Sequence, residues 1–243
     1  MLLQVGVLHS NVHSIVMSSN NMDGCISSSI SQLSQLRMIE LATMPLLTGP
    51  IPRALYALSG LRRLCICRCG LTGRLAAEIG NLAALEELQL FGNRITGLVP
   101  PSLSKLVNLK LLSLGEYTGG NDFDPQPLPP CIQHMLKLEA LFMANCNLVG
   151  PVPSWIGSLA ELRQLDLQRN SLGGQLPDSL SQLSQLLYLN LKDNEGICGA
   201  LPVEALCCLK RLNRLSLVHC SFSNVVSAEE ELARRLSRCK VWI

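Results

Sequence analysis

A fixed period of about 24 residues is the feature that most constrains how this 243-residue chain can fold. The pattern apolar-x-x-apolar-x-apolar recurs nine times, and all 27 of its apolar positions hold Leu, Ile, Val or Met. Five of the eight spacings between units are 24 residues, and the longest is 29. The units begin at Val12, Leu36, Leu61, Leu85, Leu109, Leu138, Leu162, Leu186 and Leu212.

The last two apolar positions of each unit alternate with other residues, as Leu88 and Leu90 do, which predicts a short strand with one buried face. One such strand cannot cover its own apolar face, whereas strands stacked in parallel bury it in a continuous core. Aliphatic side chains supply that core, since 48% of the residues are hydrophobic and only 4% are aromatic. The repeat therefore predicts a solenoid over residues 12–226.

The position three residues after the last apolar one accounts for several of the 11 cysteines. A side chain there enters a turn whose inward backbone groups need partners. Asn can donate and accept at once, and Cys is a smaller, weaker donor that fits the same place. We therefore interpret the three cysteines of this set as structural. The position holds Asn20, Asn93, Asn170 and Asn194, and Cys69, Cys146 and Cys220.

The second half of each unit follows the pattern Leu-x-Gly-x-(Ile/Leu/Val)-Pro, as in Thr96-Gly97-Leu98-Val99-Pro100 and Gly174-Gln175-Leu176-Pro177. Over residues 12–226 the chain resembles plant-type leucine-rich-repeat proteins, namely the repeat regions of receptor-like kinases and receptor-like proteins. The resemblance implies an α/β solenoid, a right-handed superhelix with a parallel sheet on its concave face and 3₁₀ turns and loops on its convex side. Gly suits the sharp turn, and Pro prevents a regular helix.

The two ends depart from the repeat. Residues 227–243 are interpreted as a C-terminal cap made of a helix and a terminal strand, with Ser227 and Glu230 as a capping box. An amphipathic partner-binding helix is the alternative for this segment. The resemblance implies an N-terminal cap with a Trp and paired cysteines. Residues 1–11 contain no Trp, and His9 stands near the place where a cysteine would be expected, so we expect this cap to be truncated or degenerate.

The fifth unit is 29 residues long, and its extra residues fall within 115–127. An insertion directly after a strand emerges at the rim of the concave face, and loops on a rigid scaffold are frequent binding elements. We therefore expect Tyr117, Asp122 and Phe123 to contact a partner. A tolerated surface insertion is the alternative interpretation.

The outward positions of the middle strands are the candidate partner-binding residues of the concave face. Phe91, Leu111 and Phe142 lie on successive strands, which are about 4.8 Å apart, so they could form one apolar patch. Scattered apolar surface residues are the alternative. The candidates are Arg63, Cys65, Cys67, Glu87, Gln89, Phe91, Leu111, Phe142 and Asn145.

No catalytic constellation emerges from the sequence. The four histidines have no metalloprotease spacing, and the phosphate-binding and nucleophile-elbow motifs are missing. Cys65 and Cys67 are expected to expose two thiols, which raises a metal or redox site as a minor alternative. We predict no metal, no cofactor and no enzymatic activity.

Charge and hydropathy exclude further classes of partner. The net charge is +2, with 20 basic and 18 acidic residues well mixed, which gives no electrostatic footprint for nucleic acid. No run approaches the roughly 18 apolar residues of a membrane span. We expect a monomer that binds a protein or peptide.

Two functions remain open. The first is an intracellular scaffold or adaptor, favoured by an odd number of cysteines, a poor signal peptide and the lack of any Asn-x-Ser/Thr site. The second is a fragment of a cell-surface receptor ectodomain in signalling or defence, which the resemblance implies. An enzyme is the third hypothesis, and no motif supports it.

Overall fold

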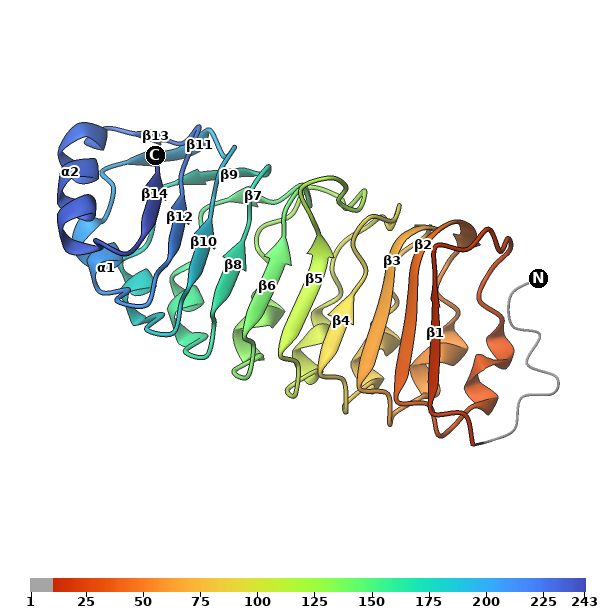
Figure 1. Ribbon diagram of the computed structural model, residues 1–243. Helices are drawn as coiled ribbons and strands as arrows, with labels where there is room; N and C mark the ends of the chain where they lie inside the picture. The colour runs from red at the N-terminus through yellow and green to blue at the C-terminus, as the bar shows by residue number, and fades with distance from the viewer. Residues whose placement is uncertain (1–10) are drawn as a thin grey trace.

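The computed structural model describes residues 11–243, and a ten-stranded parallel sheet runs through all of them (Figure 1). Each of the nine units contributes one strand, and a tenth strand follows at the C-terminus. The strands, in sheet order, are β1 (Ser14–Ser18), β2 (Met38–Gly49), β3 (Arg63–Leu71), β4 (Glu87–Gln89), β5 (Leu111–Gly115), β6 (Ala140–Met143), β8 (Gln164–Asp166), β10 (Tyr188–Asn190), β12 (Arg214–Ser216) and β14 (Lys240–Trp242).

The opposite side of the array is built from short turns of helix, one per unit (Figure 1). Five of the seven 3₁₀ turns follow a proline, such as Pro100, whose fixed φ and missing N–H suit the residue before a helical turn. The 3₁₀ turns are Ser28–Gln32, Arg53–Ala57, Ala77–Asn81, Pro101–Lys105, Pro130–His134, Ser154–Ser158 and Asp178–Gln182, and α1 (Val203–Cys207) takes the eighth place.

Between the two sides, a second set of short parallel strands pairs along the later repeats. It comprises β7 (Val149–Gly150), β9 (Ser171–Gly174), β11 (Gly196–Gly199) and β13 (Ser221–Phe222). The repeated glycine lies here with φ between +76° and +84°, from Gly49 to Gly199. Only glycine adopts this backbone without strain, which explains why the repeat pattern requires it.

The apolar frame read from the sequence forms one continuous core. Every position of the apolar-x-x-apolar-x-apolar pattern is buried except Val12 and Met17 of the first unit, which are half-buried and pack against the core. The predicted fold class, an α/β leucine-rich-repeat solenoid, is confirmed.

A ladder of asparagine side chains ties the turns together. The Nδ2 of Asn93 donates to the carbonyls of Ile66 (2.7 Å) and Leu90 (2.8 Å), and its Oδ1 accepts from the N–H of Leu71 (3.2 Å). Asn170 and Asn194 repeat this arrangement. The prediction of a turn ladder is thus confirmed for these positions, whereas Asn20 of the first unit is exposed.

The cysteines of the same position keep part of the ladder. The thiol of Cys69 donates to the carbonyl of Leu41 (3.7 Å), and that of Cys220 donates to Leu191 (3.5 Å), so each binds back to the preceding repeat. Cys146 is fully buried and donates within its own turn. All 11 cysteines lie within the described residues, and none of them forms a disulfide there.

The C-terminal segment corrects one detail of the sequence analysis. Helix α2 (Val225–Arg235) begins two residues before the predicted N-cap, so Ser227 lies inside it and its hydroxyl donates to the Asn224 carbonyl (3.1 Å). Asn224 precedes the helix, and its side chain accepts from the N–H of Leu201 (2.7 Å) in the preceding repeat. That tertiary bond fixes the start of the helix. The predicted N-terminal cap, apart from Asn11, lies outside the described residues.

Candidate ligand-binding face

The outward side chains of β3 to β6 lie in two rows across the concave face. One row runs Arg63, Glu87, Leu111 and Ala140, and the next runs Cys65, Gln89, Ser113 and Phe142. Parallel pairing in register produces these rows, so residues far apart in sequence become lateral neighbours. Most of the sequence-predicted candidates therefore do share one surface.

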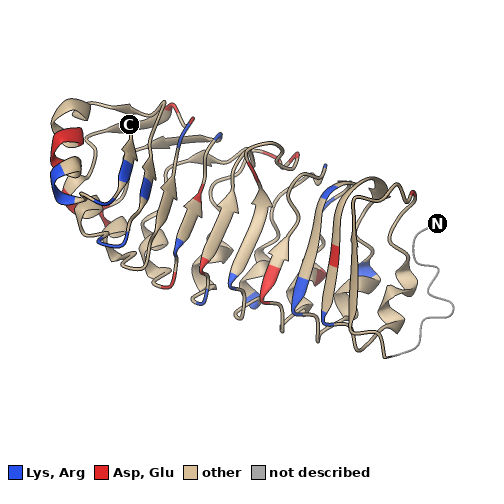
Figure 2. Ribbon diagram, viewed as in Figure 1, with Lys and Arg blue, Asp and Glu red and all other residues tan. Residues whose placement is uncertain are grey.

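Charges in the first row are paired. The guanidinium of Arg63 lies 2.6 Å from a carboxylate oxygen of Glu87. Below this row, Glu86 binds Arg62 (3.0 Å) on one side and Lys110 (2.8 Å) on the other, which holds the pKa of Glu86 below its usual value. Acidic and basic residues are interspersed along the array (Figure 2).

The expectation that Cys65 and Cys67 expose two thiols is wrong. Both face outward from β3, yet each is only 7% exposed, because their short side chains lie below longer neighbours such as Glu40 and Gln89. Burial raises the pKa of Cys65 to about 12 and also raises that of Cys67, whose thiol donates to the Gln89 carbonyl (3.4 Å). Such thiols stay protonated and are poor nucleophiles and poor metal ligands.

The three apolar candidates are half-buried and lie at different heights along their strands. Leu111 is in the first row, Phe142 is in the second, and Phe91 follows the end of β4, where the guanidinium of Arg68 lies 5.8 Å from its ring centroid. A single patch formed by Phe91, Leu111 and Phe142 stays a prediction.

The insertion is shorter than the sequence indicated. Its extra residues form a tight hairpin at Glu116–Gly119, and Asn121 then resumes the ladder with bonds to Leu90 (3.0 Å) and Leu114 (2.7 Å). Phe123 is 2% exposed because it occupies the core position that Ile95 fills one repeat earlier. Phe123 is therefore a core residue, and the expectation that it contacts a partner is wrong. Tyr117 and Asp122 are exposed.

The hairpin is held on its N-terminal side by charge. Arg68 binds both carboxylate oxygens of Glu116, with Nε at 2.8 Å and Nη2 at 3.0 Å. The Thr118 hydroxyl donates to the same carboxylate (2.7 Å), and the N–H of Gly92 donates to the Gly119 carbonyl (3.1 Å).

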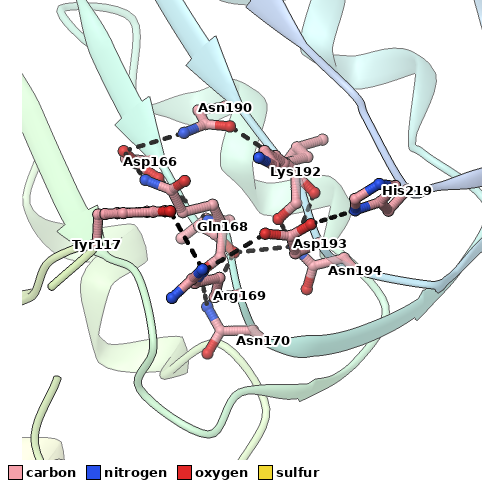
Figure 3. A network of polar contacts seen from close by, with 12 residues as sticks. Tyr117, Asp166, Gln168, Arg169, Asn170, Asn190, Lys192, Asp193, Asn194 and His219 are labelled. Atoms are coloured by element: carbon pink, nitrogen blue, oxygen red, sulfur yellow. Dashed lines mark hydrogen bonds and ion pairs between the residues drawn. The ribbon is translucent and has the colours of Figure 1, made fainter. Parts of the chain in front are cut away.

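On its C-terminal side the hairpin is held by an aromatic contact (Figure 3). The Arg169 guanidinium lies 4.1 Å from the ring centroid of Tyr117 and donates to its hydroxyl (3.2 Å). Arg169 also faces Asp193 (3.5 Å), which in turn binds His219 (2.5 Å). Since Tyr117 belongs to the fifth repeat and Arg169 to the seventh, the hairpin bridges the sixth.

An open polar cavity of about 550 Å³ lies beside this bridge. Gly120 forms part of its wall and passes so close to the Asn145 carbonyl that an added Cβ would be 1.6 Å from that oxygen. Asn145 is exposed and adopts a left-handed backbone (φ +54°), as do Arg68, Arg169 and Asp193 at the equivalent place in other repeats. The cavity is lined by Gly120, Asn121, Asp122, Phe123, Asn145, Asn147, Arg169, Asn170 and Ser171.

A second cavity, of about 450 Å³, opens on the concave face between β6 and β12. Asp166, Phe142, Leu187 and Tyr188 are among the residues that line it. Of these residues only Phe142 was a candidate from sequence. Asp166 and Tyr188 stand at ordinary outward strand positions and Leu187 directly precedes β10, and only their placement in neighbouring repeats makes them a cavity.

Within residues 11–243, no group of three or more His, Cys, Asp or Glu side chains is arranged to hold a metal ion, and no helix is long and apolar enough to cross a membrane.

Comparison with known proteins shows which sequences and structures this chain is similar to. A sequence profile described as Leucine Rich Repeat matches residues 84–106, 137–159 and 161–183. The structure is similar to the ectodomain of the Arabidopsis receptor kinase HAESA in complex with an extended IDA peptide hormone, with a TM-score of 0.81, 30% identity, and coverage of 87% of this chain and 35% of that one.

A second similar structure is the plant peptide hormone receptor RGFR1 in complex with RGF2, with a TM-score of 0.80, 27% identity, and coverage of 88% of this chain and 33% of that one. HAESA in complex with IDA and the co-receptor SERK1 matches with a TM-score of 0.76 and 28% identity, over 88% of this chain and 39% of that one. The chain thus spans between a third and two fifths of the length of the receptor chains in these structures.

Proposed function

We propose that this leucine-rich-repeat chain, which is similar to plant receptor ectodomains, binds a peptide or protein ligand on the concave face of repeats three to eight. The observation that carries the proposal is the hairpin of the fifth repeat, which is fixed across the fourth repeat by Arg68–Glu116 and across the sixth by Tyr117–Arg169. A loop that is ordered before binding reduces the entropy lost when a ligand docks against it. Two cavities flank the surface that this hairpin borders.

The partner class follows from the shape of this surface and from its relatives. A long, shallow, rigid face with polar cavities suits an extended chain, and the similar ectodomains of HAESA and RGFR1 were solved with peptide hormones bound. The mixed charges offer no phosphate-binding stripe, so the proposed ligand is no nucleic acid. We assign no catalytic residue, and we propose a monomeric binding protein that is not an enzyme.

The same face would serve a free-standing scaffold or part of a larger receptor ectodomain. The scaffold is the proposal made here, and the ectodomain is its alternative, favoured by the extent of the match to receptors. In both, the ligand contacts are the outward residues of β3 to β10 and the exposed hairpin residue Tyr117.

Peptide selection tests this proposal. A random peptide display library is selected on the wild-type protein, and the enriched peptides are measured against the double variant Phe91→Ala/Phe142→Ala by calorimetry. We expect a loss of affinity of about tenfold or more, because buried aromatic contacts dominate such interfaces.

The matched control is Val107→Ala/Leu136→Ala, which removes two exposed apolar side chains that are not on the concave strands. This control should bind the selected peptides as the wild type does. Equal loss in both double variants, or no loss in the concave one, would refute the proposed face.

A further inference from the structure

Asp166 is a buried carboxylate on a surface where buried charge is not expected. It points outward from β8, yet it is only 8% exposed. Its Oδ1 accepts from the N–H of Gln168 (3.1 Å), and its Oδ2 accepts from Gln168 Nε2 (3.0 Å), Tyr188 Oη (3.2 Å) and Asn190 Nδ2 (3.3 Å). All four donors are neutral.

No cation neutralises this carboxylate in the described part of the chain. The ion pairs of residues 11–243 do not include Asp166, and burial raises its pKa while only hydrogen bonds lower it. A carboxylate out of water without a counter-charge is costly, so such groups are usually paired in a folded protein. The hydrogen bonds hold the carboxylate in place but leave its charge uncompensated.

The space above the carboxylate is suited to a flat cation. The cavity of about 450 Å³ that Asp166 lines is also lined by Phe142, Tyr188 and Leu187. Aromatic rings attract cations, most often the guanidinium of arginine. Oδ2 already accepts three hydrogen bonds and Oδ1 only one, so Oδ1 retains room for another donor.

We propose that this cavity, the Asp166 pocket, receives an arginine side chain of the ligand, with the guanidinium donating to Asp166 and packing against Phe142 and Tyr188. The inference rests on the proposed function, and it adds the chemical class of residue that the ligand must carry. Arginine fits better than lysine because its planar, weakly hydrated head group both stacks and donates.

One residue of the protein competes with the ligand. Arg214 lines the same pocket from β12, two strands from β8, which places its backbone about 10 Å from that of Gln164, two residues before Asp166. It is exposed and forms no ion pair within the described residues. Its positive charge opposes an incoming guanidinium, so its removal should strengthen binding.

The test uses a small probe in place of the unidentified ligand. N-acetyl-arginine amide is titrated into the full chain, and the side-chain amide resonances of Gln168 and Asn190 are followed by NMR. N-acetyl-citrulline amide has nearly the same shape without the charge. We expect saturable shifts with the arginine probe and affinity at least about tenfold weaker with citrulline.

Three variants sharpen the result. Asp166→Asn should weaken arginine binding about tenfold or more, Phe142→Leu should weaken it severalfold by removing a ring while leaving the carboxylate, and Arg214→Gln should strengthen it. Thermal unfolding monitored by circular dichroism establishes that each variant is folded. Equal binding of arginine and citrulline, or an Asp166→Asn or Phe142→Leu variant that binds as the wild type does, overturns the proposal.

The two proposals can fail separately. If selected peptides depend on the concave face but show no preference for arginine and no response to Asp166→Asn, the Asp166 pocket is refuted and the binding function stands. If the arginine probe binds at Asp166 while no selected peptide depends on the concave face, the pocket stands and the peptide-binding function is refuted.

Discussion

Two carboxylates of this repeat array differ in how the protein compensates their charge. Glu86 lies between Arg62 and Lys110 in a line of alternating charges at the lower edge of the sheet. Asp166, three repeats later, lies in the middle of the concave face among neutral donors only. Their surroundings shift the two pKa values in opposite directions, downward for Glu86 and upward for Asp166.

The difference teaches how to separate structure from function on a repetitive surface. The partners of Glu86 come from the preceding and following repeats, so this charge is satisfied by the stacking itself. The charge of Asp166 is left without a partner by the fold, at a cost to stability that a ligand can remove. An unpaired charge in a cavity is therefore a better guide to a binding site than an exposed apolar residue.

Charge reversal should give the largest difference between the two sites. Asp166→Lys places an ammonium among four donors in a buried position, and we expect the free energy of unfolding to fall by about 2–4 kcal/mol. Glu86→Lys should cost clearly less, because Arg62 and Lys110 are exposed and can turn into water. Urea unfolding measures both values.

Glu161→Lys, at an exposed position, provides the baseline for adding two positive charges to the chain. Losses of equal size at positions 86 and 166 would abolish the distinction drawn between the two carboxylates.

The pH dependence of stability should have opposite sign at the two sites. Because the folded pKa of Asp166 is raised above 3.8, the folded state binds its proton more tightly, and the contribution of this group to stability falls as the pH rises from about 3.8 through the folded value. Because the folded pKa of Glu86 is lowered below 4.5, its contribution is present above 4.5 and is lost as the pH falls through the folded value.

Urea unfolding between pH 3 and pH 7 checks both signs with neutral variants. The stability of wild type relative to Asp166→Asn should decrease with rising pH, and that of wild type relative to Glu86→Gln should increase. Two difference curves with the same slope would contradict the assigned environments.

The sequence could predict the solenoid because one apolar frame repeats nine times, and errors in any single unit do not change the period. It could also predict the asparagine ladder, since Asn93, Asn170 and Asn194 stand at a fixed distance from that frame. The sequence did not identify Asn121 as a member of the ladder, because the hairpin displaces it by four residues from the expected position. Phe123 was misplaced for the same reason, because the frame resumes inside the segment that was assigned to a loop.

The site was harder to predict than the fold. Alternation along a strand tells which way Cys65 points but not how much of it its neighbours cover, so an outward thiol proved to be buried. The pairing of Tyr117 with Arg169 spans 52 residues and follows no repeat pattern. The Asp166 pocket depends on the sizes of side chains on adjacent strands, which no motif encodes.

The two contacts that hold the hairpin also differ in kind. One is an ion pair between Arg68 and Glu116, and the other places Arg169 over the ring of Tyr117. Glu116→Gln removes the charge that Arg68 binds, whereas Tyr117→Leu removes the ring over which Arg169 lies, worth about 0.5–1 kcal/mol at an exposed site. Neither change should alter global unfolding much, so hydrogen exchange of the amides in residues 116–120 is the measurement. The free energy of local opening of the hairpin should fall in both variants.

The effect of Glu116→Gln should shrink at 1 M salt, where an exposed ion pair is already screened, while that of Tyr117→Leu should persist. If the two variants lose protection equally at both salt concentrations, the charged anchor and the aromatic anchor are not independent, and the hairpin moves as one unit with the rim of the sixth repeat.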